Sequence, residues 1–193
     1  MIIGITGPTG SGKTTLLNLI RDCGGLILDC DAIYHELLAT DAAMLCALRH
    51  RFPEAFPQGT FDRKQLGAMV FSDPAALQDL NAITHAAVKK AVLAELSKNV
   101  KLAAIDAIAL FEGGLADLCD ITVAVIAPTE DRIQRIMARD GISREYAEKR
   151  VAAQHDNSWF TARCTYTLEN SGTPADCKAA CLAFLCKLGI IAL

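Results

Sequence analysis

The sequence predicts an α/β fold of three layers, α/β/α, around a five-stranded parallel sheet. Short apolar segments of strand length alternate with helix-like segments along the 193 residues, as expected when helices connect parallel strands. The first apolar segment, Met1 to Thr6, leads into glycines at 7, 10 and 12 and then into a helix from Thr14 to Arg21. The chain therefore opens in the order strand, loop, helix.

The other strands are predicted where short apolar runs recur. They lie at Leu26 to Asp29, Leu102 to Asp106, Ile121 to Ala127 and around Thr165 to Leu168. Helix-like sequence is expected directly after the runs that end at Asp106 and Ala127, because parallel strands need a crossover connection.

Helices are predicted between these runs, with Asp73-Pro74 as the cap and first turn of the longest. One mostly apolar face of that helix combines Leu77, Leu80, Thr84, Val88 and Ala91. Pro53, Pro57 and Gly59 mark a loop, and Gly141 marks a break. The predicted helices cover about 32–39, 41–51, 61–71, 74–98, 129–139 and 143–154, and a further helix ends the chain.

Composition excludes several classes of protein. The formal net charge of -3 argues against a nucleic-acid-binding protein, which needs a basic surface. No apolar run approaches the roughly 18 residues that a membrane span requires. The chain starts on an apolar strand without the pattern of a secretory signal, so we expect a cytoplasmic protein that binds neither membranes nor nucleic acids.

Eight cysteines are present without a C-x-x-C pair, and a reducing cytosol disfavours disulfides. We expect them to serve as small apolar fillers. Cys177, Cys181 and Cys186 lie at helical spacing, where buried thiols are favoured over metal ligands.

The segment from Gly7 to Thr14 reads Gly-Pro-Thr-Gly-Ser-Gly-Lys-Thr, which matches the G-x-x-x-x-G-K-[ST] pattern of a phosphate-binding P-loop. In such a loop, backbone N–H groups and a helix N-terminus surround the phosphate oxygens of ATP. Lys13 would reach the β- and γ-phosphates, and Thr14 would ligate Mg²⁺. The predicted nucleotide-binding residues are Gly7, Pro8, Thr9, Gly10, Ser11, Gly12, Lys13, Thr14 and Thr15.

Three carboxylates follow predicted strands and are candidates for chemistry. Asp106 ends an apolar run, the usual place of a residue that supports Mg²⁺ from a neighbouring strand. Asp29 and Asp31 follow the second strand, at the sheet edge where ligands bind in open α/β sheets. From spacing alone, Asp31 is equally well interpreted as the base that accepts a proton from an attacking hydroxyl or as a helix cap.

Several ordered motifs resemble the dephospho-coenzyme A kinase family. They are Leu28 to Asp31, Phe61 to Arg63, Leu80 to His85, Asp106 to Leu115, Arg135 to Gly141, Ala147 to Gln154 and Leu168 to Gly172. A P-loop alone is shared by many unrelated NTPases, so this ordered set carries the specificity.

The resemblance implies a single P-loop kinase domain over 1–193. Its core would comprise about 1–31, 101–138 and 160–193, with a helical acceptor-binding insert at about 32–100 and a small helical lid at about 139–159. The implied reaction moves the γ-phosphate of ATP to the ribose 3′-hydroxyl of dephospho-CoA, giving CoA and ADP.

The resemblance also implies roles for individual residues. Asp31, Lys13 and Arg139 would be catalytic, and Asn170 would lie in the loop beside the adenine. Asp31, Arg63, His85 and Glu112 would bind the acceptor, while Thr14 and Asp106 would hold Mg²⁺. The implied enzyme is a monomer or a weak homo-oligomer.

Basic residues concentrate in the lid segment. Arg132, Arg135 and Arg139 share one helix face by their spacing, and Arg139 is the expected phosphate clamp. The other basic residues of this segment are expected to pair with Glu145, Glu148 and Asp140, in exposed ion pairs of little energetic weight.

Two positions depart from the family pattern, because Ala86 and Ile108 replace prolines that are usual there. Both lie on the acceptor side, so a kinase for another nucleotide or small metabolite is the alternative interpretation. A GTP-dependent switch is disfavoured, because the chain has no Asn-Lys-x-Asp or Thr-Lys-x-Asp segment.

Overall fold

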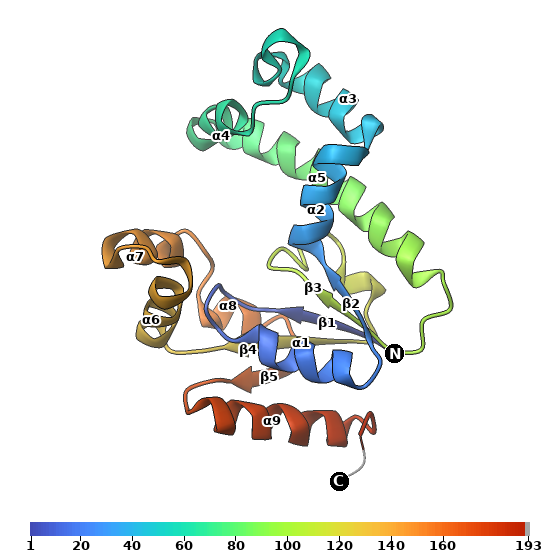
Figure 1. The fold of residues 1–193 in the computed structure, drawn as a ribbon, viewed down its shortest axis with the longest axis vertical. Coiled ribbons are helices and arrows are strands. Elements are labelled where there is room, and N and C mark those ends of the chain that lie inside the picture. Colours follow the sequence, from blue (N-terminus) through green and yellow to red (C-terminus); the bar gives the residue numbers. More distant parts are fainter. Residues whose placement is uncertain (192–193) are drawn as a thin grey trace. The chain divides into compact units, whose positions relative to one another are not determined.

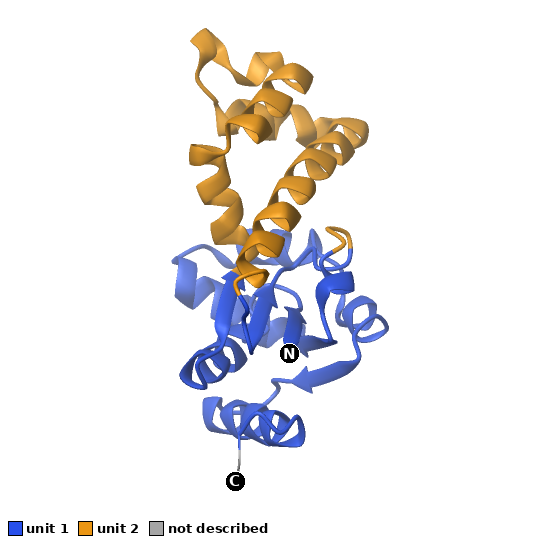
Figure 2. Ribbon diagram, turned by 90° about the vertical axis from the view of Figure 1, so that its right-hand side faces the viewer, with its two compact units in different colours: residues 1–28, 99–111, 115–193 blue, residues 29–98, 112–114 orange. Residues whose placement is uncertain are grey.

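A computed structural model describes residues 1–191. Residues 192 and 193, the last two of the predicted core segment 160–193, lie outside the described residues. The chain forms two compact units, coloured separately in Figure 2. Unit 1 comprises residues 1–28, 99–111 and 115–191 of the described chain, and unit 2 comprises residues 29–98 and 112–114.

A parallel sheet of five strands forms the centre of unit 1 (Figure 1). The strands are β1 (Ile2–Thr6), β2 (Leu26–Asp29), β3 (Ala103–Asp106), β4 (Ile121–Ile126) and β5 (Tyr166–Glu169). Their order across the sheet is β2-β3-β1-β4-β5. The predicted five-stranded parallel sheet is therefore confirmed, and each observed strand lies within one residue of its predicted bounds.

Successive side chains of each strand point to opposite faces of the sheet, and the two faces have different neighbours. Ile3 and Ile5 of β1 and Val123 and Val125 of β4 are buried in one cluster. That cluster also contains residues of α1 (Lys13–Asp22) and α9 (Pro174–Lys187), so these two helices cover this face. Burial of such aliphatic side chains is the main source of stability for the sheet.

The opposite face meets loops and a short helix. A Cβ at Gly4 would lie 2.8 Å from Cys119 Sγ and 2.9 Å from Leu110 Cδ2, so the segment after β3 packs closely on β1. Thr6 Oγ1 donates to the Ile108 carbonyl oxygen at 3.1 Å. Helix α8 (Asn157–Thr161) packs against β4. Helices and loops thus flank the sheet on both sides.

Helices α6 (Thr129–Asp140) and α7 (Arg144–Ala152) belong to unit 1, and the predicted lid segment of about 139–159 contains α7 and only the end of α6. They are joined through Gly141, whose φ of +64° is left-handed and ends α6 as a C-cap glycine does. Ile133, Ile136 and Ala147 form a small buried cluster between the two helices. The predicted helix, break and second helix are confirmed.

Unit 2 is helical. It contains α2 (Cys30–Thr40), α3 (Ala42–Arg51), α4 (Arg63–Ser72) and α5 (Pro74–Leu96), with 3₁₀ turns η1 (Pro53–Ala55) and η2 (Pro57–Gly59) between α3 and α4. Its core gathers Leu48, Phe52, Phe56, Leu66 and Ala76. Asp41, Asp62 and Asp73 cap α3, α4 and α5 by accepting backbone N–H bonds.

Some expectations on secondary structure are wrong. No regular α-helix follows β3 directly, because Ala107–Leu115 forms turns that bury Leu110 and Leu115, and only the 3₁₀ turn η3 (Ala116–Leu118) succeeds them. Helix α8 was not predicted. On α5, Leu77 is 43% exposed and Ala76 is buried instead, although Thr84 and Val88 are buried as expected.

The eight cysteines differ in burial: three are buried, three are half-buried and two are exposed. Cys177 and Cys181 are buried in the unit 1 core, whereas Cys23 and Cys46 are exposed and do not act as apolar fillers. Burial raises the pKa of Cys181 to about 12, and Cys177 beside it adds to that rise. Within residues 1–191, no helix combines the length and apolar character that crossing a membrane requires.

Candidate active site

The loop between β1 and α1 requires glycine for steric reasons. Gly7, Gly10 and Gly12 have φ values of +138°, +82° and +96°, which side chains rarely adopt. A Cβ at Gly7 would lie 2.0 Å from the Val125 carbonyl oxygen, and one at Gly12 would lie 2.2 Å from Asn170 Nδ2. The loop therefore fits tightly against the ends of β4 and β5.

The loop presents a helix N-terminus that suits an anion. Gly12 is the N-cap residue of α1 in a left-handed conformation and has no side chain to cap the helix. The Thr15 amide of the first turn donates to the Gly12 carbonyl oxygen at 3.2 Å, and first-turn amides that lack an acceptor inside a helix favour phosphate oxygens. Lys13 Nζ donates to the Gly7 carbonyl oxygen at 2.8 Å, which holds the ammonium group across the loop. Thr14 is exposed at the same helix end.

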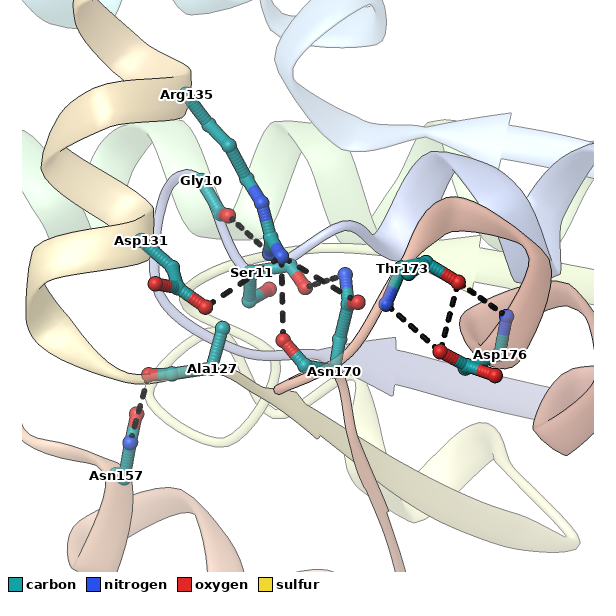
Figure 3. Close-up of polar contacts among 9 residues, drawn as sticks. All are labelled: Gly10, Ser11, Ala127, Asp131, Arg135, Asn157, Asn170, Thr173 and Asp176. Carbon is teal, nitrogen blue, oxygen red and sulfur yellow. Dashed lines mark hydrogen bonds and ion pairs between the residues drawn. The ribbon is translucent and has the colours of Figure 1, made fainter.

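Arg135 of α6 and Asn170, which follows β5, brace the second half of the loop (Figure 3). Arg135 donates to the Gly10 carbonyl oxygen at 3.3 Å and to the Asn170 carbonyl oxygen at 3.2 Å. Asn170 is buried, and its Nδ2 donates to the Ser11 carbonyl oxygen at 2.9 Å. These bonds connect α6, the end of β5 and the loop, so Asn170 does lie beside the P-loop.

Arg132 and Gln154 brace the first half of the loop at Thr9. Arg132 Nε donates to the Thr9 carbonyl oxygen at 3.0 Å. Gln154 Oε1 accepts from the Thr9 backbone N–H at 2.9 Å, and its Nε2 donates to Thr9 Oγ1 at 2.8 Å. Arg132 also donates to Gln154 Oε1 at 3.4 Å, which closes a ring of three residues.

Arg132 places a buried positive charge beside the loop. It is 2% exposed, and burial lowers the pKa of its guanidinium, although arginine remains charged in proteins. No carboxylate within the described 191 residues forms an ion pair with it. A buried cation is stabilised by a nearby anion, so a triphosphate bound in the loop would be favoured electrostatically. The residues present fit ATP.

One buried side-chain hydroxyl of the loop is unsatisfied. Ser11 is fully buried, and its Oγ has no hydrogen-bond partner among the residues that the structure describes. A buried hydroxyl without a partner costs about 1–3 kcal/mol.

The predicted magnesium ligands come from adjacent elements of unit 1. Asp106 ends β3, and its register partner on β1 is Ile5, close to the start of the P-loop. Parallel strands end at the same sheet edge, so Asp106 and the α1 N-terminus with Thr14 share that edge. A carboxylate and a hydroxyl are oxygen ligands of the kind that Mg²⁺ prefers, so the residues fit this ion.

Arg139 does not contact the P-loop in this structure. Its Nε and Nη2 donate to Asp140 at 2.7 and 3.1 Å, and Arg150 donates to the same carboxylate. Hydrogen bonds from Arg139 and then Arg150 lower the pKa of Asp140 to about 2. The other predicted lid pairs are confirmed as Lys149 with Glu145 and Arg144 with Glu148, and Arg144 also pairs with Glu130.

Two of the predicted acceptor-binding residues line one pocket of unit 2. His85 and Glu112 border a pocket of about 370 Å³ together with Leu77, Gln78 and Asn81. Pro74 and Ala82 complete its lining. The pocket thus combines an apolar floor from α5 with two amides, an imidazole and a carboxylate, a mixture suited to a polar organic ligand.

Asp31 and Arg63 lie elsewhere in unit 2. Asp31 is an exposed residue in the first turn of α2, and the helix cap is Asp29, whose carboxylate accepts from the amides of Asp31 and Ala32 at 3.0 Å. The cap interpretation of Asp31 is therefore wrong. Arg63 begins α4 and is exposed. Burial raises the pKa of Tyr34 on α2, and the charge of Arg63 opposes that rise.

Sequence reasoning missed the roles of Arg132, Arg135 and Gln154. The spacing of the two arginines identified their shared helix face but not its contact with the loop. Gln154 ended one of the motifs that carry the family resemblance, but no role was predicted for it, because its partner Thr9 is 145 positions away in the chain.

A model of the dephospho-CoA kinase family matches residues 1–176. A dephospho-CoA kinase of Thermus thermophilus is 39% identical over 189 residues, which cover 97% of this chain and 92% of that protein. One from Geobacter sulfurreducens is 36% identical over 181 residues, covering 91% and 92%.

Solved structures agree with these matches. A crystal structure from Thermus thermophilus, at 39% identity, covers 97% of both chains with a TM-score of 0.82. A dephospho-CoA kinase from Campylobacter jejuni has a TM-score of 0.66 at 23% identity, covering 97% of this chain and 96% of that one. At that identity it supports the fold alone. The family match over 176 residues and the two curated relatives show that this chain belongs to the dephospho-CoA kinase family.

Proposed function

We propose that this protein transfers the γ-phosphate of ATP to the ribose 3′-hydroxyl of dephospho-CoA, producing CoA and ADP in the last step of CoA synthesis. The observation that carries the proposal is the P-loop. Its glycines hold the backbone against β4 and β5, and the buried charge of Arg132 lies beside it without a carboxylate partner in residues 1–191. Membership of the family supplies the acceptor.

Unit 1 supplies the phosphate-donor half of the reaction. The loop from Gly7 to Thr15 surrounds the phosphates with backbone amides other than that of Thr9, which is bonded to Gln154. Lys13 leaves the Gly7 carbonyl to neutralise the β- and γ-phosphates. Thr14 and Asp106 would hold Mg²⁺, which would supply neutralisation of the negative charge of the phosphates. Asn170 borders the adenine. Arg139 contacts the transferring phosphoryl group after it leaves Asp140.

Unit 2 supplies the acceptor half. His85 and Glu112 bind dephospho-CoA in the pocket beside α5, and Arg63 contributes a positive charge from the start of α4. Asp31 orients the 3′-hydroxyl and accepts its proton. Phosphoryl transfer has a loose transition state, so positioning contributes more than proton removal. Asp31 is exposed and is not used as the cap of α2, which suits this role.

The enzyme works in the cytoplasm as a monomer or weak homo-oligomer, and it has no nucleic-acid or membrane partner.

The test measures ADP release from ATP and Mg²⁺ with and without dephospho-CoA, and detects CoA by mass spectrometry. Acceptor-dependent ADP and stoichiometric CoA are expected, with both lost in Lys13→Ala. Asp31→Asn should bind ATP normally but form CoA slowly. ATP binding without CoA formation would reject the acceptor, and a panel of nucleosides and small alcohols would then identify another.

A further inference from the structure

We infer that Gln154 is a positioning residue that couples the lid to the P-loop and so sets the affinity for ATP. The inference rests on the proposed function, since it concerns the ATP site of that kinase. Gln154 is not among the residues assigned above to ATP, magnesium or acceptor.

The first observation is that the Gln154 side chain bonds both the backbone N–H and the side-chain hydroxyl of Thr9. Gln154 Oε1 accepts from the Thr9 N–H, and Gln154 Nε2 donates to Thr9 Oγ1. A carboxamide has one acceptor end and one donor end, so the two bonds define both its orientation and the rotamer of Thr9. Because the Thr9 amide is already bonded, Thr9 shapes the loop and other amides remain for phosphate.

The second observation is that Arg132 of α6 bonds to both Thr9 and Gln154. Its guanidinium bonds to the Thr9 carbonyl oxygen and to Gln154 Oε1. A Cβ on Gly10 would lie 2.8 Å from the Arg132 carbonyl oxygen, so the loop rests directly on the backbone of α6. The start of α6 and the loop therefore form one closely packed piece.

The third observation concerns the place of Gln154 in the lid. It follows α7, which packs on α6 through Ile133, Ile136 and Ala147. A shift of α7 therefore acts on Thr9 through Gln154, since the carboxamide cannot move without breaking its bonds to the loop. The position of α7 and the geometry of the loop are thus coupled through the Gln154 side chain.

The test replaces Gln154 with methionine, which keeps the length and volume of the side chain and removes both bonds. The affinity for a non-hydrolysable ATP analogue with Mg²⁺ is measured by calorimetry, and KM is measured for both substrates. We expect the dissociation constant of the analogue to rise at least about tenfold, as loss of one or two hydrogen bonds implies. The KM for dephospho-CoA should change less than about twofold.

Gln134→Ala is the matched control. Gln134 is an exposed glutamine of α6 whose Nε2 donates to Glu130 at 2.9 Å, without contact to the loop. The Gln134→Ala variant should bind the ATP analogue with the affinity of the wild type. Thr9→Val removes only the hydroxyl contact and keeps the side-chain shape, so it gives a second reading if Gln154→Met does not fold.

A thermodynamic cycle links the two residues. If they act through their mutual contact, Thr9→Val should add little to the loss already caused by Gln154→Met. Unchanged analogue affinity in Gln154→Met, or additive effects in the double variant, would overturn the inference. Equal losses for both substrates together with a lower thermal midpoint would show a merely structural role. The calorimetry needs no acceptor, so failure of the wild type to form CoA would reject only the proposed function.

Discussion

Asn170 Nδ2 donates a 2.9 Å hydrogen bond to the Ser11 carbonyl oxygen, across 159 positions of sequence. The backbone N–H of Asn170 bonds to the Ile126 carbonyl oxygen at 2.8 Å, so the pairing of β4 and β5 places the side chain. The side-chain nitrogen Nδ2 of Asn170 would lie 2.2 Å from a Cβ on Gly12. The loop can therefore keep this contact only with glycine at position 12.

Gly12→Ala should consequently lose both stability and ATP binding. The left-handed φ of +96° costs a side chain about 1–2 kcal/mol, and the clash with Asn170 Nδ2 must also displace either that side chain, which breaks its bond to Ser11, or the loop backbone. We expect ATP affinity to fall by more than about 100-fold, which corresponds to roughly 3 kcal/mol. Calorimetry with Mg²⁺-ATP and thermal unfolding measure the two effects.

Gly24→Ala is the control for backbone strain alone. Gly24 has φ of +80°, but a Cβ there would meet no atom within 4 Å. This variant should lose stability while binding ATP normally. Similar ATP losses in both variants would mean that strain, and not the contact with Asn170, controls the loop.

Asp29 and Asp31 should separate stability from chemistry. Asp29→Ala removes the cap of α2 and should cost about 1 kcal/mol of unfolding free energy, with kcat nearly unchanged. Asp31→Asn should leave stability within about 0.5 kcal/mol and lower kcat by about 10²-fold or more. Denaturant unfolding and steady-state kinetics on both variants test this. A normal kcat in Asp31→Asn would remove Asp31 from the mechanism.

The sequence predicted best what depends on local patterns. Apolar runs located every strand, and the Gly7 to Thr14 pattern located the P-loop, because both signals lie within a few neighbouring residues. Helix boundaries that depend on a capping side chain were predicted less accurately. Helix α2 begins at Cys30 and not near Ala32, because Asp29 bonds two amides of the first turn.

Long-range contacts were not predictable from pattern. The Leu110 to Leu115 segment appears helix-like by composition, yet it is held in turns that bury both leucines. Gln154 and Arg132 reach Thr9 only after α6 and α7 pack together. His85 and Glu112 were assigned by family resemblance, and their shared pocket became visible only in the folded unit 2.

The lid ion pairs should persist over the whole physiological pH range. The pKa of Asp140 is lowered to about 2 by Arg139 and then Arg150, and that of Glu130 is lowered to about 2 chiefly by Arg144. A lowered folded-state pKa stabilises the protein above the unfolded value and loses that contribution as pH falls. The loss should therefore begin below about pH 4 and continue to about pH 2.

Carbon-detected NMR of the side-chain carboxyls measures these values directly. The Asp140 and Glu130 titrations should have midpoints well below the ordinary pKa values of aspartate and glutamate side chains. The Asp140 midpoint should rise in Arg139→Ala, because the hydrogen bonds from Arg139 are the largest cause of the lowered Asp140 pKa. A wild-type midpoint near 3.8 would show that these exposed pairs do not persist in solution.

Arg139 must leave Asp140 before it can contact a phosphoryl group, because both its Nε and one terminal nitrogen are bonded to that carboxylate. We therefore expect Arg139→Ala to lower kcat by about 10³-fold, the lower range for a transition-state arginine, while ATP affinity changes less than about threefold. Arg150→Ala is the matched control, since Arg150 shares Asp140 and has no assigned contact with substrate. It should keep a kcat close to that of the wild type. Rapid-quench kinetics measures the chemical step itself and so separates a slower phosphoryl transfer from slow product release. Equal losses of kcat and ATP affinity in Arg139→Ala would assign Arg139 to ground-state binding instead.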